Sequence, residues 1–136
     1  MRPIPVGARG TYALVVRPEH LADRFKDATL PQVFATPMMV LSMENAALNA
    51  IREYLEPGES AVGTAVNIRH LAATPVGHRV EALAEVTKVD GRRIEFEVTA
   101  RDETELIGSG THERMVVELA RLGGRLAGKP HGRTRR

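Results

Sequence analysis

The sequence predicts one α+β domain in which a single long helix packs against an antiparallel sheet. Three observations favour this class. One segment has the apolar spacing of a helix, a strand pattern precedes it, and four alternating segments with turn residues between them follow it. The length of 136 residues suits one domain with a substantial core, and no internal repeat or second domain is visible.

The first strand is expected at residues 11–16, where Tyr12, Leu14 and Val16 share one face. Residues 17–35 follow no clear period and contain two prolines and several charges. We expect a short helix or a loop over the core there, and either a lid or a plain connection fits the segment.

The long helix is expected over residues 37–55, where apolar residues recur every three or four positions. Thr36 and Pro37 suit its start, because threonine can cap free N–H groups and proline fits the first helical position. The helix is apolar over more than one stripe, so we expect burial on several sides and pairing with a second subunit. Small side chains that would let another backbone approach closely stand at Ala46, Ala47 and Ala50.

The strand after the helix is expected at residues 60–71. Strict alternation would place His70 on one face with Val66 and Ile68, and Gly63 on the opposite face.

The remaining strands are expected at residues 79–89, at the segment around residues 94–101 and at about residues 106–118. Asp90-Gly91 between the first two of these is a strong hairpin signal. Together with the helix, the four strands predict a sheet that wraps around it.

The composition is that of a globular protein, with 43% hydrophobic and 26% charged residues. No apolar run reaches the roughly 18–20 residues that a membrane helix needs, and the first residues lack the apolar region of a signal peptide. Without cysteine the chain has no disulfide and no thiol nucleophile. We expect a cytoplasmic protein with no membrane partner.

The net charge of +2 is unevenly distributed. Residues 121–136 hold six basic and no acidic side chains, which leaves 13 basic against 17 acidic residues, a net charge of −4, in residues 1–120. This pattern predicts a domain over residues 1–120 and a basic, flexible tail over 121–136. A phosphate-binding tail remains an alternative, but the acidic body and only five aromatic residues disfavour nucleic acid.

Glu44 lies inside the most apolar stretch of the chain, between methionine, valine and leucine residues on one side and alanines on the other. A carboxylate is costly to bury unless it is paired or protonated. Glu44 is therefore a candidate site residue, although a structural ion pair with Arg69 or Arg114 would also explain it.

Thr36 and His70 are the other candidates. A Glu–His pair in a dry site can share a proton and activate water, and burial would raise the pKa of Glu44. N–H groups at the helix start could hold an oxyanion. The simpler interpretations stay open, with Thr36 as a helix cap and His70 as a structural histidine at a strand end.

Thr36 and Glu44 cannot easily share a site within one chain. Eight residues of straight helix separate them by about 12 Å. A shared site therefore requires a helix that starts after residue 36, or a second subunit that supplies one of the two side chains.

Other site signals are weak. The five histidines show no metal-ligand spacing, so we expect no metal. Gly108-Ser109-Gly110 lacks the third glycine of a dinucleotide loop, and Ser42 and Ser60 lack the context of a nucleophile elbow.

Several segments closely resemble the fluoroacetyl-CoA thioesterase family, in order and over roughly residues 5–120. They are Val33-Phe34-Ala35-Thr36, Met43-Glu44, Tyr54-Leu55-Glu56-Pro57-Gly58-Glu59, Gly63-Thr64-Ala65, His70-Leu71-Ala72-Ala73-Thr74-Pro75 and Ile107-Gly108-Ser109-Gly110-Thr111-His112-Glu113-Arg114.

The resemblance implies the hot-dog fold, in which a long helix is wrapped by an antiparallel sheet. It also implies a homodimer, or a dimer of such dimers, that hydrolyses acyl-CoA thioesters at the subunit interface without a cofactor. By the same resemblance, Thr36, Glu44 and His70 are catalytic, the backbone of Gly63 binds the thioester region, and Arg114 lies near the substrate.

The expected chemistry is hydrolysis with Glu44 as general base or nucleophile. A thiol leaving group has a pKa near that of cysteine, about 8.5, so its departure needs little acid help. The sequence departs from the family pattern where phenylalanines of the lid become Asp27 and Leu30, and where a tryptophan after the glutamate becomes Asn45. These departures favour a broader short acyl-CoA thioesterase over recognition of fluorine.

Two alternatives remain at this point. A non-catalytic acyl-CoA-binding or regulatory hot-dog domain would tolerate the loss of Glu44 and His70, yet the chain has both. A hydratase of the same fold usually has an Asp-x-x-x-x-His pattern on the helix, which is absent between residues 36 and 55.

Overall fold

The computed structural model describes residues 1–130, and five strands in it form one antiparallel sheet. The strands are β1 (Arg9–Val15), β2 (Glu59–His70), β3 (Arg79–Asp90), β4 (Arg93–Arg101) and β5 (Leu106–Glu118). Their order across the sheet is β1-β3-β4-β5-β2, so β1 and β2 are its edges.

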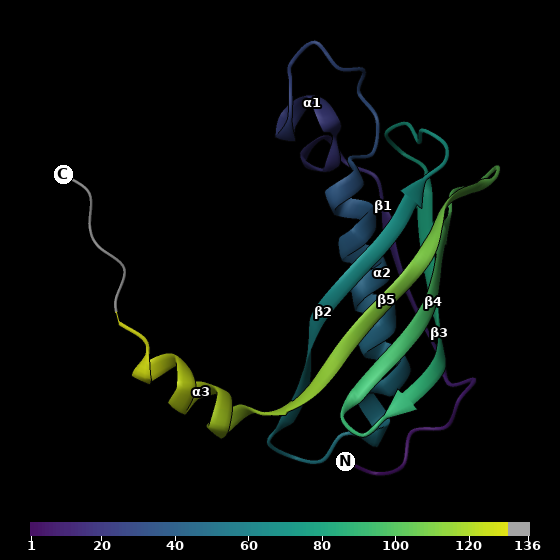
Figure 1. Ribbon diagram of the computed structural model, residues 1–136. Helices are drawn as coiled ribbons and strands as arrows, with labels where there is room; N and C mark the ends of the chain where they lie inside the picture. The colour runs from purple at the N-terminus through teal and green to yellow at the C-terminus, as the bar shows by residue number, and fades with distance from the viewer. Residues whose placement is uncertain (131–136) are drawn as a thin grey trace.

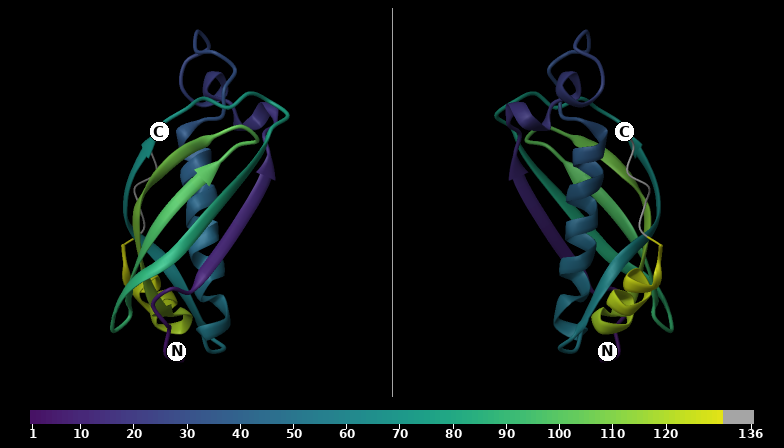
Figure 2. Two further views of the ribbon diagram at one scale, coloured as in Figure 1. Left: turned by 90° about the vertical axis from the view of Figure 1, so that its right-hand side faces the viewer. Right: turned by 90° about the vertical axis from the view of Figure 1, so that its left-hand side faces the viewer.

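One long helix, α2 (Thr36–Ile51), lies along the inner face of this sheet, which curls around it (Figures 1 and 2). The shorter helices are η1 (Pro18–His20), α1 (Ala22–Phe25), η2 (Arg52–Tyr54) and α3 (Leu119–Gly128). The predicted α+β architecture is confirmed, as is the prediction of one strand, one helix and four further strands in that order.

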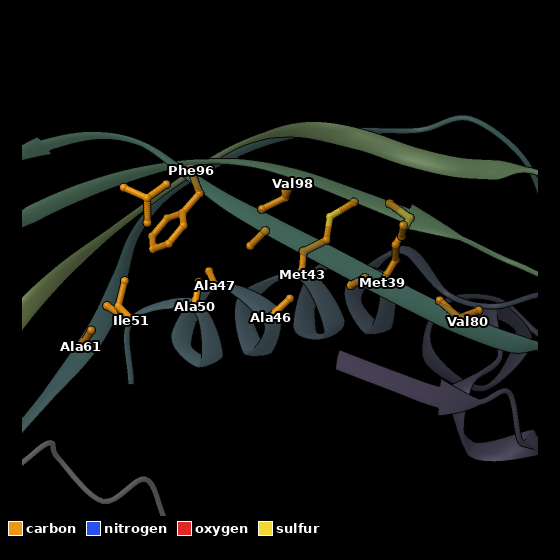
Figure 3. Packing of buried hydrophobic residues seen from close by; sticks show 14 of the residues in the cluster. Met39, Met43, Ala46, Ala47, Ala50, Ile51, Ala61, Val80, Phe96 and Val98 are labelled. Carbon is orange, nitrogen blue, oxygen red and sulfur yellow. The ribbon is translucent and has the colours of Figure 1, made fainter. Parts of the chain in front are cut away.

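The core lies between α2 and the inner face of the sheet, as Figure 3 shows for Met39 and Met43 beneath Phe96 and Val98. The predicted alternation holds in β3 and β4. Their inward residues are almost fully buried, namely Val80, Ala82, Ala84, Val86, Ile94, Phe96, Val98 and Ala100. Burying a valine, isoleucine or phenylalanine side chain stabilises the fold by about 1.5–3 kcal/mol, so this layer contributes strongly to the stability of the core.

Helix α2 begins earlier than predicted, because Thr36 and Pro37 are its first two residues and Ala35 occupies the cap position. No side chain caps this end, so the interpretation of Thr36 as a helix cap is wrong. At the other end of the helix, β1 approaches closely. A methyl group on Gly10 would collide with backbone atoms of Ala46 and Ala50, which confirms that small residues let another backbone approach.

Strand β2 contains a bulge that the alternating pattern does not reveal. Gly63 pairs with Arg114 on β5 but Ala65 pairs with Glu113, so one extra residue lies between them. The extra residue shifts the side-chain phase by one position. Gly63 therefore faces the helix on the same side as His70, and the predicted placement on opposite faces is wrong.

The basic C-terminal segment starts with structure. Helix α3 follows β5 directly and projects away from the sheet (Figure 1), and none of its residues is buried. The rest of the predicted tail, residues 131–136, lies outside the described residues. Within residues 1–130, every helix is too short or too polar to cross a membrane.

Candidate active site

The first group of site residues is the Thr36–His70 pair. The Thr36 hydroxyl lies 2.8 Å from His70 Nδ1, which joins the first turn of α2 to the end of β2. His70 Nε2 is buried and has no hydrogen-bond partner within the described part of the chain. The pair borders an open depression of about 400 Å³, whose other walls are Ala22, Val33, Phe34, Leu71, Ala72 and Ala73.

Burial controls the charge of His70. Removing the imidazole from water disfavours its protonated form, which lowers the pKa of His70, and the backbone of Ala72 works in the opposite direction. A neutral ring whose Nδ1–H donates to Thr36 has a free lone pair on Nε2, and such an atom can accept a proton.

The second group is the Glu44 cluster, which consists of Glu44, Gly63, His112 and Arg114. Arg114 Nη1 lies 3.7 Å from Glu44 Oε2, and the exposed fractions of the two side chains are 9% and 34%. The expectation of a deeply buried carboxylate is therefore wrong for the single chain. Of the two ion pairs considered from the sequence, the structure contains the one with Arg114.

Gly63 makes room for the carboxylate of Glu44. A Cβ atom at this position would lie 2.7 Å from Glu44 Oε2 and 3.3 Å from His112 Cε1. The bulge in β2 is what turns this position inward. Any side chain at residue 63 would consequently displace Glu44 from the inner surface of the strand.

His112 is a member of this cluster that the sequence analysis did not select. Its Nδ1 lies 2.7 Å from the Ala65 carbonyl oxygen, and its Nε2 lies 3.2 Å from Arg114 Nη1. A signal for it existed. Histidine and arginine two residues apart on a strand share a face, and on β5 that face otherwise carries glycine and valine.

The two groups do not meet in a single chain. Because α2 already begins at Thr36, Glu44 lies two turns further along the helix, about 12 Å away. Along β2, the seven residues from Gly63 to His70 span about 20 Å. Over residues 1–130, no hydrogen bond or ion pair connects Glu44 with His70, so the expected Glu–His contact is absent within one subunit.

Comparison with known proteins gives one consistent result. The family model for fluoroacetyl-CoA-specific thioesterase matches residues 16–120. A fluoroacetyl-CoA thioesterase from Streptantibioticus cattleyicolor is 44% identical over 129 residues, which cover 91% of this chain and 93% of that protein.

Solved structures agree with this result. The fluoroacetyl-CoA thioesterase FlK is 41% identical with a TM-score of 0.88, over 95% of this chain and 99% of that one. A hot-dog-like protein from Thermanaerovibrio acidaminovorans is 25% identical with a TM-score of 0.84, over 96% of each chain. The hot-dog fold expected from the sequence is thus confirmed.

Proposed function

This chain belongs to the fluoroacetyl-CoA-specific thioesterase family, and on that premise we propose that it hydrolyses a short acyl-CoA to the free acid and CoA. The proposal depends on one structural observation above all. His70 on β2 has a buried Nε2 without a hydrogen-bond partner among the described residues, and the Glu44 carboxylate on α2 lies beside Gly63, which is also on β2. The two groups face the same side of β2 but form two separate half-sites.

A second copy of the chain would join the two half-sites. In a two-fold dimer, the Thr36–His70 pair of one subunit can face the Glu44 cluster of the other, and the same contact then occurs twice. This arrangement removes the 12 Å problem, because Glu44 comes from the partner subunit. It also accounts for the exposure of Glu44, which at 34% is accessible from outside its own chain.

Strand β2 is a suitable interface for such a dimer. It is a 12-residue edge strand, and Val62 and Val66 on it are exposed. Edge strands with apolar surface tend to pair with another strand. If two copies pair antiparallel about an axis through Asn67, the extra residue of the bulge leaves Gly63 of one strand opposite His70 of the partner subunit.

The chemistry then proceeds with few groups. In the general-base route, Glu44 takes a proton from water while the water oxygen bonds to the thioester carbonyl carbon. The C–S bond breaks next, and the thiolate leaves without a strong acid. In the alternative route, a Glu44 carboxylate oxygen bonds to the carbonyl carbon, the C–S bond breaks and the thiolate leaves. Water then hydrolyses the resulting anhydride to the free acid and restores Glu44.

Thr36 and His70 would serve the proton transfers. The Thr36 hydroxyl fixes the ring through Nδ1, so that Nε2 faces the reacting atoms. In the anhydride route, His70 can then accept a proton from the water that hydrolyses the anhydride.

The depression beside His70 supports a short acyl group. Apart from Thr36 and His70 its walls are apolar, and three of them are alanines, which leaves space for a small apolar chain. Asp27 and Leu30, which replace lid aromatics of the family, are exposed and do not line the depression. We therefore propose that acetyl-CoA and fluoroacetyl-CoA are both accepted, without strong selection for fluorine.

Thiol release from a panel of short acyl-CoAs tests the proposal. Glu44→Gln removes the base but keeps the side-chain shape, so kcat should fall about 10²–10⁴-fold. Glu97→Gln, on an exposed position of β4, is the matched control and should equal wild type. If the protein releases no thiol from any acyl-CoA, the enzyme proposal is lost.

The non-catalytic alternative predicts a different outcome. A regulatory acyl-CoA-binding domain would bind the panel by calorimetry without turnover, and Glu44→Gln would leave that binding intact. We propose the enzyme because the chain contains the residues of both half-sites, Thr36 and His70 in one and Glu44 in the other. The cytoplasmic location expected from the sequence remains part of this proposal.

A further inference from the structure

His112 and Arg114 form a buried polar chain on the inner face of β5. They are 3% and 8% exposed, and they lie on the strand beside the edge strand that carries Gly63. Two basic side chains are costly to bury side by side unless their hydrogen bonds are satisfied. The hydrogen-bond partners of His112 and Arg114 therefore indicate the role of this pair.

The partners of His112 define its protonation state. The Ala65 carbonyl can only accept a hydrogen bond, so Nδ1 at 2.7 Å must carry the proton. The Arg114 guanidinium can only donate, so Nε2 at 3.2 Å must carry a lone pair. Both contacts are satisfied only by the neutral ring with its proton on Nδ1.

Arg114 is consequently held at two points. Nη2 donates to the Ala61 carbonyl at 2.7 Å, and Nη1 donates to His112 Nε2. The second hydrogen of Nη1 is left for Glu44 Oε2, at 3.7 Å. The orientation of the guanidinium toward Glu44 thus depends on the acceptor that His112 provides.

We propose that His112 is a positioning residue of the thioesterase: its neutral ring, fixed by the Ala65 carbonyl in the β2 bulge, orients Arg114 so that Nη1 faces and places the Glu44 carboxylate. The inference rests on the proposed function for its effect on turnover. It links the bulge to the reacting carboxylate through three contacts, none of which involves the Thr36–His70 pair.

Two further observations agree with this role. The His112 ring stacks on Phe96, with ring centroids 5.9 Å apart, which restricts its rotation. Burial is the largest effect and lowers the pKa of His112, although the hydrogen bond to the Ala65 carbonyl acts against it. The Arg114 charge lowers this pKa further, and the charges of Glu44 and Glu113 oppose it. The neutral ring is therefore the stable form beside the guanidinium.

Two substitutions distinguish the effect of the Nδ1–H donor of His112 from that of its Nε2 acceptor. His112→Asn keeps an N–H group near Ala65 but is too short to reach Arg114, whereas His112→Gln brings an amide oxygen toward the Nε2 position. We expect His112→Asn to lower kcat by up to about a hundredfold with little change in KM. His112→Gln should restore most of that loss. Equal activity of both variants, whether high or low, would overturn the proposal.

A double-mutant cycle tests whether His112 acts through Arg114. In the Arg114→Met background the guanidinium is gone, so His112→Asn should have no further effect on kcat. A merely structural histidine would instead give additive losses. Ile4→Ala, a core substitution outside the Glu44 cluster, controls for lost stability alone and should leave kcat of the folded fraction unchanged.

A measurement on the unmodified protein is independent of turnover. The ¹⁵N shifts of the imidazole distinguish its tautomers, and His112 should show a protonated Nδ1 and an unprotonated Nε2 at neutral pH. A proton on Nε2 would overturn the inference even in an active enzyme. If the protein has the expected tautomer but hydrolyses no acyl-CoA, the proposed function fails and the arrangement of His112 and Arg114 stands.

Discussion

Glu44 is the one charged residue of α2, and its position requires three other residues. Arg114 compensates its charge, Gly63 leaves space for its carboxylate, and His112 holds Arg114. The sequence predicts that Glu44 is exceptional, because a lone acid among methionines and alanines is costly. The sequence places His112 on the same strand face as Arg114 but does not reveal its contacts, since one of them involves the neighbouring strand β2.

Gly63→Ala tests the space that Glu44 needs. The added methyl group would meet the flexible end of Glu44 at 2.7 Å, so the carboxylate should move while the fold remains. We expect kcat to fall by up to about a hundredfold, which a displacement of roughly 1 Å can cause. Thiol release and the melting temperature should be measured together.

Gly124→Ala is the matched control, because nothing lies within 4 Å of a Cβ atom there. It should retain full activity. Wild-type kcat in Gly63→Ala would show that Glu44 does not need its present position.

The pKa of His112 predicts a pH dependence of stability. In the unfolded chain this ring titrates near its ordinary pKa of about 6.5, and burial lowers the pKa in the folded state. As pH falls through and below that ordinary value, the unfolded chain binds a proton that the folded chain excludes, and the free energy of unfolding decreases.

His112→Gln cannot take up this proton. Its urea-unfolding free energy should therefore decrease less than that of wild type between neutral pH and pH values below about 6.5. His70 has a pKa shifted in the same direction and is present in both proteins, so the difference isolates His112. Parallel pH profiles would contradict the assignment.

At the level of the elements, alternation identifies β3 and β4 correctly because each has one buried and one largely exposed face. It also locates β2, but it assigns Gly63 to the wrong face of this edge strand, which has apolar and small residues on both faces. A bulge there leaves no mark in the pattern, and its one-residue shift moves Gly63 to the inner face. The cap prediction for Thr36 also fails because of a contact between distant segments. The Thr36 hydroxyl bonds His70 on β2 and not the N–H groups of the helix start.

The contact between β1 and α2 can be tested by Gly10→Ala. The new methyl group would meet backbone atoms of Ala46 and Ala50, which cannot rotate away, so strand and helix must separate. Overpacking of this kind costs about 1–3 kcal/mol. Chemical unfolding measures the loss, and Gly123→Ala in α3, where space is open, is the control. Equal stability of the two variants would refute the close contact.

For the whole molecule, the fold follows from one chain but the proposed active site does not. The sequence shows the difficulty, since Thr36 and Glu44 are eight residues apart on one helix. It does not show which solution applies, because a later helix start and a second subunit are equally compatible with the residues. The helix begins at Thr36, which leaves the second subunit as the solution we propose.

Mixing two inactive variants tests this central claim most directly. Co-refolded His70→Ala and Glu44→Ala chains would form hybrid dimers in about half of all cases, and each hybrid would contain one site with an intact His70 and an intact Glu44 of the partner subunit. The account predicts recovery of about a quarter of wild-type thiol release, because one of two sites in half of the dimers is complete. Activity no higher than that of the two parent variants would contradict it.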